Sequence, residues 1–543
     1  MVKYIRICAL LILSMVFIPI IYAQQGLLQQ TQLNDYYRRL QLAGDTSIKS
    51  SFTLQPYQPR FTEALFQQKK DSFRLQSVIG FTLQHNSALP YGYNDESLFP
   101  AIGFQQRFTA GVNFETKDFQ LKLQPEWVNA SNTDGKDLIP PPDNTLNNYW
   151  GKYFAMLANR IDMPSQFGNQ QLSKVFAGQS AIRYKFGGFA AGVSTENIWW
   201  GPARYNALIM GNNAPGFLHA NLTTTRPVAT PIGVFEAQVI FGKLNASGIT
   251  PPEFDRISQL GCPQCYEPAP DTKTRNITGY VFSYSPKGME NFTVGMAYAS
   301  YKYADTGLKA STLGSLFFRY VMPKDHAEIY AEYGRSDKMM SPFAMFKDSV
   351  PYGYTIGFRK MVPTRKRGDF ISISAELSHL GLSKAKLIFD PNNVFGGPNP
   401  NSYSWYTSSS IRHGYTNFGQ VMGASIGPGS NSQTLNIAWV SGEKQIGMQL
   451  QRVMRNTDFY YYYYFNGTIG LGNTAAFWAD ISASLYGQWK FKQLQVAGSI
   501  DYLSSINYKW LKLDGDFGSP SSLSDKRNFQ IRVSLLYSID WMK

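Results

Sequence analysis

Apolar and polar residues alternate along much of this chain, and this pattern sharply limits the folds that it can adopt. Between Phe104 and Glu115, one set of alternate residues is mainly aromatic or aliphatic, and the other set is mainly polar. Successive side chains of a β-strand point to opposite faces, so the pattern predicts a strand with one apolar and one polar face. The same pattern recurs at 119–127, 327–333, 371–377, 446–450, 481–489 and 494–502.

Soluble sandwiches and membrane barrels both contain such strands, but the number of strands and the last strand favour a barrel. The alternating runs suggest about 16 to 18 strands, within the range of single-chain bacterial barrels. The chain ends in a further alternating strand from Phe529 to Trp541, with Leu536 as its exception. Because an open sheet edge cannot persist in lipid, this strand is expected to close the ring. The predicted fold class is all-β: a large, closed, antiparallel transmembrane β-barrel in the outer membrane of a Gram-negative cell.

The composition agrees with a membrane barrel and argues against membrane-spanning helices. Aromatic residues make up 15% of the chain and charged residues only 16%, below the ~25% of an ordinary soluble domain. After the first residues, no stretch reaches the ~20 apolar residues that a membrane helix needs. In a barrel only alternate residues face lipid, so the mean hydropathy stays mild.

The first residues have the pattern of a secretory signal peptide. Lys3 and Arg6 precede an apolar stretch from Ile7 to Tyr22, and Ala23 follows. A basic start, a short apolar core and a small residue at the exit predict cleavage after Ala23, so that residues 1–23 are removed. The alternative is a membrane anchor, for which the stretch is slightly short.

Residues 24–75 are polar and irregular, and we interpret them as a periplasmic N-terminal segment. Asn34 is placed to cap a short helix from Asp35 to Leu42 that would end near Gly44. This segment is expected to pack against the barrel mouth. The barrel itself is predicted to span residues 76–543.

Long polar segments rich in Asn, Gly and Pro separate some of the predicted strands. Barrels have short periplasmic turns and long outer loops, so we place these segments outside the cell. They are residues 130–148, 247–275, 390–417 and 504–524.

Two cysteines remain after removal of the signal peptide, in the sequence Cys262-Pro-Gln-Cys265. In a secreted protein such a pair is expected to form a small, structural disulfide. A zinc site would need further ligands nearby, and a redox pair would need a thioredoxin-like context, and the sequence shows neither. We therefore expect no metal and no cofactor.

The formal charge of the chain is +14, and loss of Lys3 and Arg6 from a signal peptide without acidic residues leaves +12. A positive balance favours anionic partners such as lipopolysaccharide or an acidic surface polysaccharide, while the compartment argues against nucleic acid. The alternative is that the basic residues meet only the phosphate-rich heads of outer-membrane lipids. A monomer is expected.

Several local patterns resemble chemical motifs without the context that such motifs need. Gly423-Ala-Ser-Ile-Gly427 matches the G-x-S-x-G pattern of hydrolases, but it lies in a Gly-rich loop between predicted strands rather than in a strand-turn-helix elbow. The five histidines show no metalloprotease spacing. We therefore expect no enzyme. The run Tyr460–Tyr464 is interpreted as strand residues of an aromatic girdle, with a sugar-stacking platform as the alternative.

One segment carries a motif for recognition. Glu196 is followed by Trp199-Trp200-Gly201-Pro202, by Asn212-Asn213-Ala214-Pro215 and by Arg226-Pro227, before a predicted strand at 231–244. This segment resembles the Wzi family of capsule-assembly outer-membrane proteins, in which a Glu, a Trp-Gly-Pro and an Asn-Asn-Ala precede a return strand. The signal peptide, the short helix and the large barrel extend the resemblance over most of the chain. The sequence departs from the family pattern at Ala203 and Gly216, where we expect Gly and a bulkier residue.

The resemblance implies a lectin-like barrel that binds capsular or related polysaccharide and helps to attach or assemble it at the cell surface. Aromatic faces suit the C–H surfaces of sugar rings, and amides and charges suit their hydroxyls. The candidate ligand-binding residues are Glu196, Trp199, Trp200, Arg204, Asn212, Asn213 and Arg226. The alternative for this segment is a plug in the lumen, whose Trp side chains pack and whose Asn side chains satisfy buried backbone groups.

Two other classes of function compete with the lectin. A transport porin or substrate-specific channel would conduct ions, whereas an occluded lumen favours the lectin. A structural partner of a secretion or adhesion machine would be recovered with that machine from outer membranes.

Overall fold

The computed structural model describes residues 30–55, 73–133, 135, 153, 157–168, 170–250, 274–304, 306–336, 350–382, 404–465, 477–510 and 525–542. The predicted signal peptide and the pair Cys262 and Cys265 lie outside the described residues. Both therefore stay predictions.

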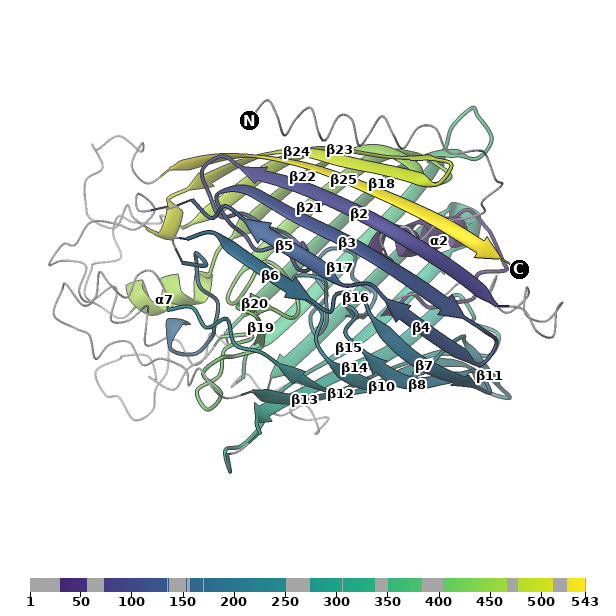
Figure 1. Ribbon diagram of the computed structural model, residues 1–543, viewed down its shortest axis with the longest axis horizontal. Coiled ribbons are helices and arrows are strands. Elements are labelled where there is room, and N and C mark those ends of the chain that lie inside the picture. Colours follow the sequence, from purple (N-terminus) through teal and green to yellow (C-terminus); the bar gives the residue numbers. More distant parts are fainter. Residues whose placement is uncertain are drawn as a thin grey trace, which may run out of the picture.

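One closed β-barrel contains nearly all the described strands (Figure 1). In chain order its segments are β2 (Arg74–Asn86), β3 (Gly103–Glu115), β4 (Phe119–Leu123), β5 (Glu126–Ala130), β6 (Leu172–Phe176), β7 (Ala181–Phe186), β8 (Phe189–Ser194), β10 (His219–Thr224), β11 (Val228–Thr230), β12 (Gly233–Leu244), β13 (Arg275–Pro286), β14 (Phe292–Tyr303), β15 (Ser311–Met322), β16 (Ala327–Ser336), β17 (Tyr352–Pro363), β18 (Asp369–Gly381), β21 (Asn431–Ser441), β22 (Lys444–Met454), β23 (Ala479–Phe491), β24 (Leu494–Ile506) and β25 (Lys526–Met542). The pairs β4 and β5, β6 and β7, and β10 and β11 each form one interrupted strand, so the described residues build an 18-stranded wall. The predicted fold class is confirmed.

The first and last strands of the wall, β2 and β25, close the ring. They pair antiparallel from Arg74 opposite Met542 to Asn86 opposite Gln530. The closing strand was predicted from its alternation, and β2 begins two residues before the predicted boundary at residue 76. The remaining wall strands pair with the strands next to them in the chain.

The wall has an apolar outside and a polar inside. On β3, Phe104 and Phe108 are 53% and 42% exposed on the outer surface, whereas Gln105 and Arg107 are buried in the interior. This is the reverse of a soluble sandwich, because lipid replaces water on the outside. The protein is therefore an outer-membrane barrel. Within the described residues, no helix combines the length and apolar character needed to cross a bilayer.

The two rims of the barrel differ in the length of their connections. We call the rim that carries Arg74 and Met542 the terminal rim, and the opposite one the outer rim. At the terminal rim, two residues suffice to join β7 to β8, β21 to β22 and β23 to β24. The four long polar segments of the sequence all join strands that end at the outer rim. Short turns face the periplasm and long loops face outside, so this arrangement agrees with the prediction.

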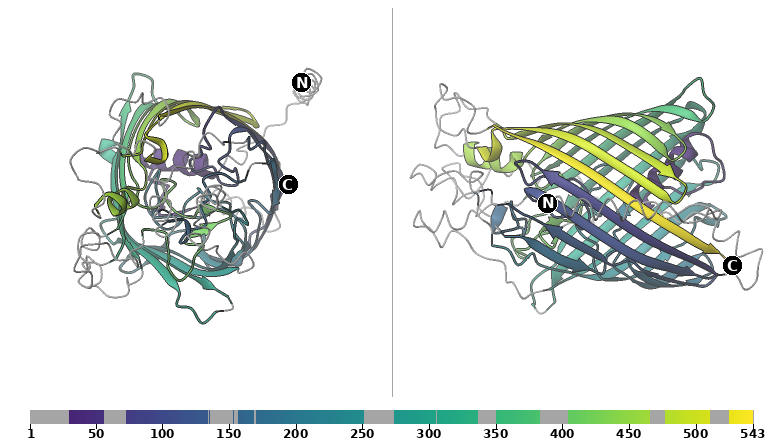
Figure 2. Two further views of the ribbon diagram at one scale, coloured as in Figure 1. Left: turned by 90° about the vertical axis from the view of Figure 1, so that its left-hand side faces the viewer. Right: turned by 45° about the horizontal axis from the view of Figure 1, so that its top comes forward.

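A helix and several inward-folded segments occupy the lumen. Helix α2 (Gln30–Leu42) lies inside the ring, towards the terminal rim (Figure 2). Inside the barrel, β1 (Leu54–Gln55) pairs with β9 (Trp199–Trp200), and β19 (Thr416–Asn417) pairs with β20 (Gln420–Val421). Apolar residues of these segments and the inner wall form a buried core that includes Trp200, Leu208, Met210, Trp405, Tyr406, Tyr415, Val281 and Tyr301.

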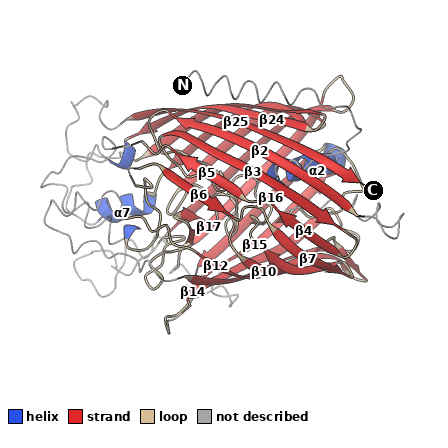
Figure 3. Ribbon diagram, viewed as in Figure 1, coloured by secondary structure: helices blue, strands red, loops and turns tan. Residues whose placement is uncertain are grey.

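Two predicted helix and strand assignments need correction. The N-terminal helix exists, but it includes Gln30 to Asn34 and lies in the lumen rather than against the mouth. Asn34 therefore does not cap it, and its side-chain amide instead donates to Gln55 Oε1 (2.7 Å). The tyrosine run belongs to helix α7 (Thr457–Phe465) at the outer rim and not to a strand (Figure 3). Two 3₁₀ turns complete the elements, η6 (Pro323–Asp325) and η8 (Tyr508–Trp510).

Candidate functional site

Ion pairs fasten α2 to the interior of the wall. Asp35 Oδ1 lies 2.9 Å from Arg359 Nη1 and 3.0 Å from Arg204 Nη2. Arg38 Nε lies 2.9 Å from Glu328 Oε1, and Arg319 of β15 reaches the same carboxylate. Burial alone would raise the pKa of Asp35, but the guanidinium groups around it hold that pKa far below its usual range. The helix is thus held by charges that stay ionised.

The predicted recognition segment is an inward excursion of the wall. It leaves β8 after Ser194 and rejoins the wall at His219 of β10, and these two residues are paired. At its base the chain passes so close to itself that a Cβ on Gly216 would overlap the carbonyl oxygen of Thr195. A bulkier residue cannot fit there, which explains why the sequence has Gly at this position.

Glu196 begins the excursion and is fully engaged within the protein. Its carboxylate pairs with Lys122 Nζ at 3.0 Å and with the guanidinium of Arg183. Burial opposes the charged form, but these two cations lower the pKa of Glu196 to about 2. Glu196 therefore acts as a charged anchor between the excursion and strands β4 and β7.

The two tryptophans of the motif are buried in the lumen. Trp200 is 0% exposed, and its Nε1 donates to Gln238 Oε1 on β12 (2.8 Å). Trp199 Nε1 donates to the carbonyl oxygen of Ala203 (3.1 Å), and the ring also lines a luminal cavity. Such contacts are expected if the segment is a plug whose Trp side chains pack inside the lumen.

The structure does not gather the other candidate residues into one place. Arg204 pairs with Asp35 and donates to Ser374 Oγ (2.7 Å). Asn212 donates to Thr31 Oγ1 of α2 (3.0 Å), and Asn213 donates to the Val421 carbonyl oxygen (3.1 Å). Arg226 lies on the turn between β10 and β11 at the terminal rim, in a small separate cavity. Of the seven candidates, Glu196, Trp199 and Asn212 share one cavity.

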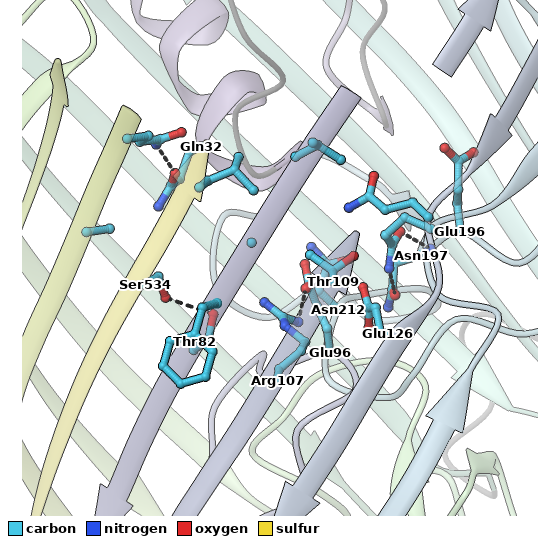
Figure 4. Close-up of a pocket in the computed structure, with 18 of the residues that line it drawn as sticks. Gln32, Thr82, Glu96, Arg107, Thr109, Glu126, Glu196, Asn197, Asn212 and Ser534 are labelled. Atoms are coloured by element: carbon cyan, nitrogen blue, oxygen red, sulfur yellow. Dashed lines mark hydrogen bonds and ion pairs between the residues drawn. The ribbon is translucent and has the colours of Figure 1, made fainter. Parts of the chain in front are cut away.

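That cavity, which we call the luminal cavity, lies beside α2 (Figure 4). Its volume is ≈ 90 Å³. Gln32, Thr82 and Arg107 also line an adjoining space of ≈ 160 Å³. Both volumes exceed the ~10–15 Å³ that one water needs. Nearly half of the lining residues carry amides or hydroxyls, including Asn34, Gln55, Gln124, Asn197, Thr109 and Ser534.

A second cavity, which we call the outer cavity, opens among the segments at the outer rim and measures ≈ 210 Å³. Three tight ring contacts shape one side of it. The ring of Trp478 lies 5.1 Å from that of Tyr508 and 5.3 Å from that of Trp510, in edge-to-face arrangements. Phe459 of α7 packs behind Trp510 at 5.0 Å. The half-buried rings of Tyr91 and Tyr153 line it as well.

Charged and strained residues surround these rings. Asp480 accepts from Trp478 Nε1 (3.0 Å) and pairs with Arg455 (2.8 Å), and Lys509 Nζ donates to Ser165 Oγ (3.1 Å). Lys509 and Trp510 both adopt positive φ, at 51° and 55°. Consecutive left-handed residues other than Gly are costly, and such strain tends to cluster at functional sites. The indole nitrogen of Trp510 is buried without a partner within the described residues.

The sequence interpretation missed the outer cavity. It placed 504–524 outside the cell, but it did not single out Tyr508-Lys509-Trp510 or Trp478. An aromatic-Lys-aromatic triplet at the start of an outer loop was the available signal. The contact between this triplet and Trp478 depends on the pairing of β23 with β24, which fixes Ala479 opposite Ile506.

The segment Gly423–Gly427 connects β20 to β21. It leads into a strand, whereas the hydrolase motif requires a helix after the nucleophile. Ser425 lines the outer cavity. Within the described residues, no group of three or more His, Cys, Asp or Glu side chains is arranged to hold a metal ion.

Two short segments, residues 91–96 and 212–213, separate the cavities, and we call them the partition. Tyr91 and Asn213 line the outer cavity, whereas Asp95 and Asn212 line the luminal spaces. The two segments are joined by a hydrogen bond from Glu96 N to the Asn212 carbonyl oxygen (2.8 Å). The neighbouring residues Asn212 and Asn213 thus belong to opposite cavities.

Comparison with known proteins gives a structural likeness only. No family profile and no curated protein matches the sequence. The structure is similar to that of Wzi from Escherichia coli, an outer-membrane protein involved in group 1 capsule assembly and described as a carbohydrate-binding β-barrel. The TM-score is 0.56 at 12% identity, over 94% of this chain and 98% of that chain.

Two barrels of Pseudomonas aeruginosa also match, with lower scores. OccK8 (OprE) has a TM-score of 0.40 at 8% identity, over 87% of this chain and 99% of that chain. OprD has a TM-score of 0.40 at 7% identity, over 86% of this chain and 95% of that chain. The likeness to Wzi shows the fold, that of a large outer-membrane barrel, and membership of the Wzi family stays a prediction.

Proposed function

We propose that this outer-membrane barrel is a non-enzymatic lectin that binds a surface polysaccharide at its outer rim and helps to attach or assemble it there. The observation that carries the proposal is the outer cavity, where aromatic rings and polar groups converge at the rim with long loops. Ligand sites of this kind combine apolar and aromatic walls with a few placed polar groups. No cofactor takes part.

The chemistry of the outer cavity suits a sugar chain that carries acidic groups. The faces of Tyr91, Tyr153 and Trp478 offer stacking surfaces, and Lys509 supplies a cation among them. Arg455 also lies there, but it pairs with Asp480. The net charge of the chain would draw an anionic polymer towards the surface. The Escherichia coli protein of similar fold is described as carbohydrate-binding, which supports the proposal by analogy.

A substrate-specific channel is the alternative, and the filled lumen argues against it. Helix α2 and the excursion 195–218 occupy the interior (Figure 2). Leu208 and Met210 of the excursion pack with Trp405 and with inner-wall residues in one buried core. An open porin of this strand number would have an aqueous channel instead.

The test compares two tryptophan variants in a strain that lacks the chromosomal gene. Trp478→Ala removes a stacking face of the outer cavity, whereas Trp127→Ala removes a lipid-facing ring of β5 that is 41% exposed. Retention of polysaccharide in the cell-associated fraction should fall with Trp478→Ala and stay normal with Trp127→Ala, provided that both proteins fold. Equal retention with and without the gene would reject the lectin and favour the channel.

Salt separates the contributions of charge and stacking. Exposed charges are screened over ~10 Å at 0.1 M salt, so binding of the purified polymer should weaken as salt rises. The part of the affinity that is lost in Trp478→Ala should persist at moderate salt. If binding of the polymer changed neither with salt concentration nor with Trp478→Ala, the polymer would not be bound in the outer cavity.

A further inference from the structure

The luminal cavity has the lining of a binding site, and the partition separates it from the outer cavity. It is enclosed by α2 on one side and by the inner faces of β2, β3, β24 and β25 on the other (Figure 4). The small side chain of Ala497 lies on the wall side of the space. Its adjoining space reaches Gln445, the second residue of β22, so it approaches the terminal rim.

Most charged side chains around this space are already paired with one another, and the Glu126 carboxylate, which also lines it, accepts from Ser97 Oγ. Arg107 Nη1 lies 2.6 Å from Glu96 Oε2, and Lys122 Nζ lies 3.0 Å from Glu196 Oε1. Arg532 pairs with Asp95 in the adjoining space. Charges satisfied in this way offer little attraction to a charged ligand, which would have to displace a partner.

One amide of the lining, in contrast, has unused hydrogen-bonding capacity. Gln495 is 5% exposed and lines the cavity, and its Nε2 donates to Gln32 Oε1. Its own Oε1 has no hydrogen-bond partner within the described residues. A buried amide oxygen without a partner is unfavourable unless a ligand or water supplies a donor.

We infer that the luminal cavity and its adjoining space form a second binding site, for a neutral, hydroxyl-rich ligand such as a short uncharged oligosaccharide. Hydroxyl groups both donate and accept, so they can satisfy Gln495 Oε1 together with neighbouring amides such as Gln55 and Gln124. Trp199 supplies the one tryptophan ring of the cavity lining. The ligand reaches this site from the terminal rim, and the site is distinct from the outer cavity proposed for the surface polymer.

A thiol reporter tests this site in the purified, full-length protein. Ala497 lines both luminal spaces, and Ala497→Cys places a thiol there with little change in volume. The rate at which a small maleimide modifies this position is followed by mass spectrometry of the peptide that contains it. Saturating maltotetraose should slow the modification at least ten-fold, and the acidic tetragalacturonate should not. No slowing by maltotetraose, or equal slowing by both sugars, would overturn the inference.

Two glutamine variants separate binding from folding. Gln495→Leu in the reporter background should raise the maltotetraose concentration needed for half-protection at least ten-fold. Gln451→Leu is the matched control, because Gln451 is equally buried on the inner wall but lies outside the luminal lining. Equal effects of both variants would overturn the site. Trp478→Ala should leave protection unchanged, so a failure of the outer-cavity proposal is distinguishable from a failure here.

Discussion

Charged residues inside this barrel join parts of the chain that are far apart in sequence. Asp35 of α2 pairs with Arg204 of the excursion and with Arg359 of β17, and Glu328 of β16 pairs with Arg38 of α2. The cost of removing such charges from water is offset only while each has its partner. The position of α2 in the lumen therefore depends on a few side chains.

Replacement of Asp35 by Asn should loosen α2. It leaves Arg204 and Arg359 with an uncompensated charge, so docking of the helix should weaken by about 2–3 kcal/mol. Hydrogen exchange of residues 30–42 measures this change. The control is Asp45→Asn, which removes the same charge from an exposed position after the helix. Equal exchange in the two variants would contradict the role of Asp35.

The docking of α7 should depend on pH through Asp458. Asp458 Oδ2 accepts hydrogen bonds from Leu382 N (2.8 Å) and from Ser404 Oγ. Burial raises the pKa of Asp458 from 3.8 to about 6, despite these two hydrogen bonds. A raised pKa favours docking at low pH. This contribution should be complete below about pH 4 and lost as pH rises through 6, a difference of roughly 3 kcal/mol.

Hydrogen exchange of residues 457–461 between pH 4 and 7, corrected for the intrinsic exchange rate, measures this dependence. Asp458→Asn cannot ionise, yet its amide oxygen can accept both hydrogen bonds. It should therefore keep α7 docked across the whole range. The same pH dependence in the Asn variant would rule out Asp458 as the titrating group.

At the scale of elements, the wall was predictable and the lumen was not. Alternation over 529–541 was sufficient to predict β25 and its role at the seam, because the period of two is imposed by the strand itself. The tyrosine run of α7 was misassigned because tyrosine favours strands. The hydrogen bond from Phe459 N to Asn456 Oδ1 (3.3 Å) shows that a helix-capping residue preceded the run.

The candidate site was predictable only in part, for a physical reason. Glu196, Trp199 and Asn212 do lie around one cavity, but their partners Lys122, Arg183 and Thr31 come from distant strands and from α2. Contacts of this kind depend on tertiary packing, which leaves no periodic signal in a single sequence. The outer cavity depends in the same way on the alignment of β23 with β24.

Deletion of β25, residues 526–542, should abolish the barrel. Strands β2 and β24 would each lose a partner along their length, and unpaired backbone groups are not tolerated in lipid. The truncated protein should lose heat-modifiable migration in gel electrophoresis. The control is Trp541→Ala, which removes one outward-facing ring and keeps the strand. Normal migration of the truncated protein would contradict the closure of the ring by β25.

At the scale of the whole molecule, the barrel encloses a packed interior. A wall of this strand number can surround an aqueous channel, yet α2 and the inward segments occupy the described lumen. The intact protein should thus conduct poorly in planar bilayers. Deletion of residues 30–55 removes α2 and β1 but leaves the wall, and it should raise single-channel conductance. Unchanged conductance would mean that α2 does not limit the passage.

The partition is the common boundary of the outer cavity and the luminal cavity. Asn212 and Asn213 are consecutive, and their carbonyl and side-chain groups are held by Glu96 on one side and Val421 on the other. A ligand in the outer cavity that contacts Asn213 would therefore act next to the lining of the luminal cavity. By thermodynamic linkage, any effect of one ligand on the affinity for the other is the same in both directions. The lumen runs between the two sides of the membrane, and this pair of residues lies where the cavity of one side meets the cavity of the other.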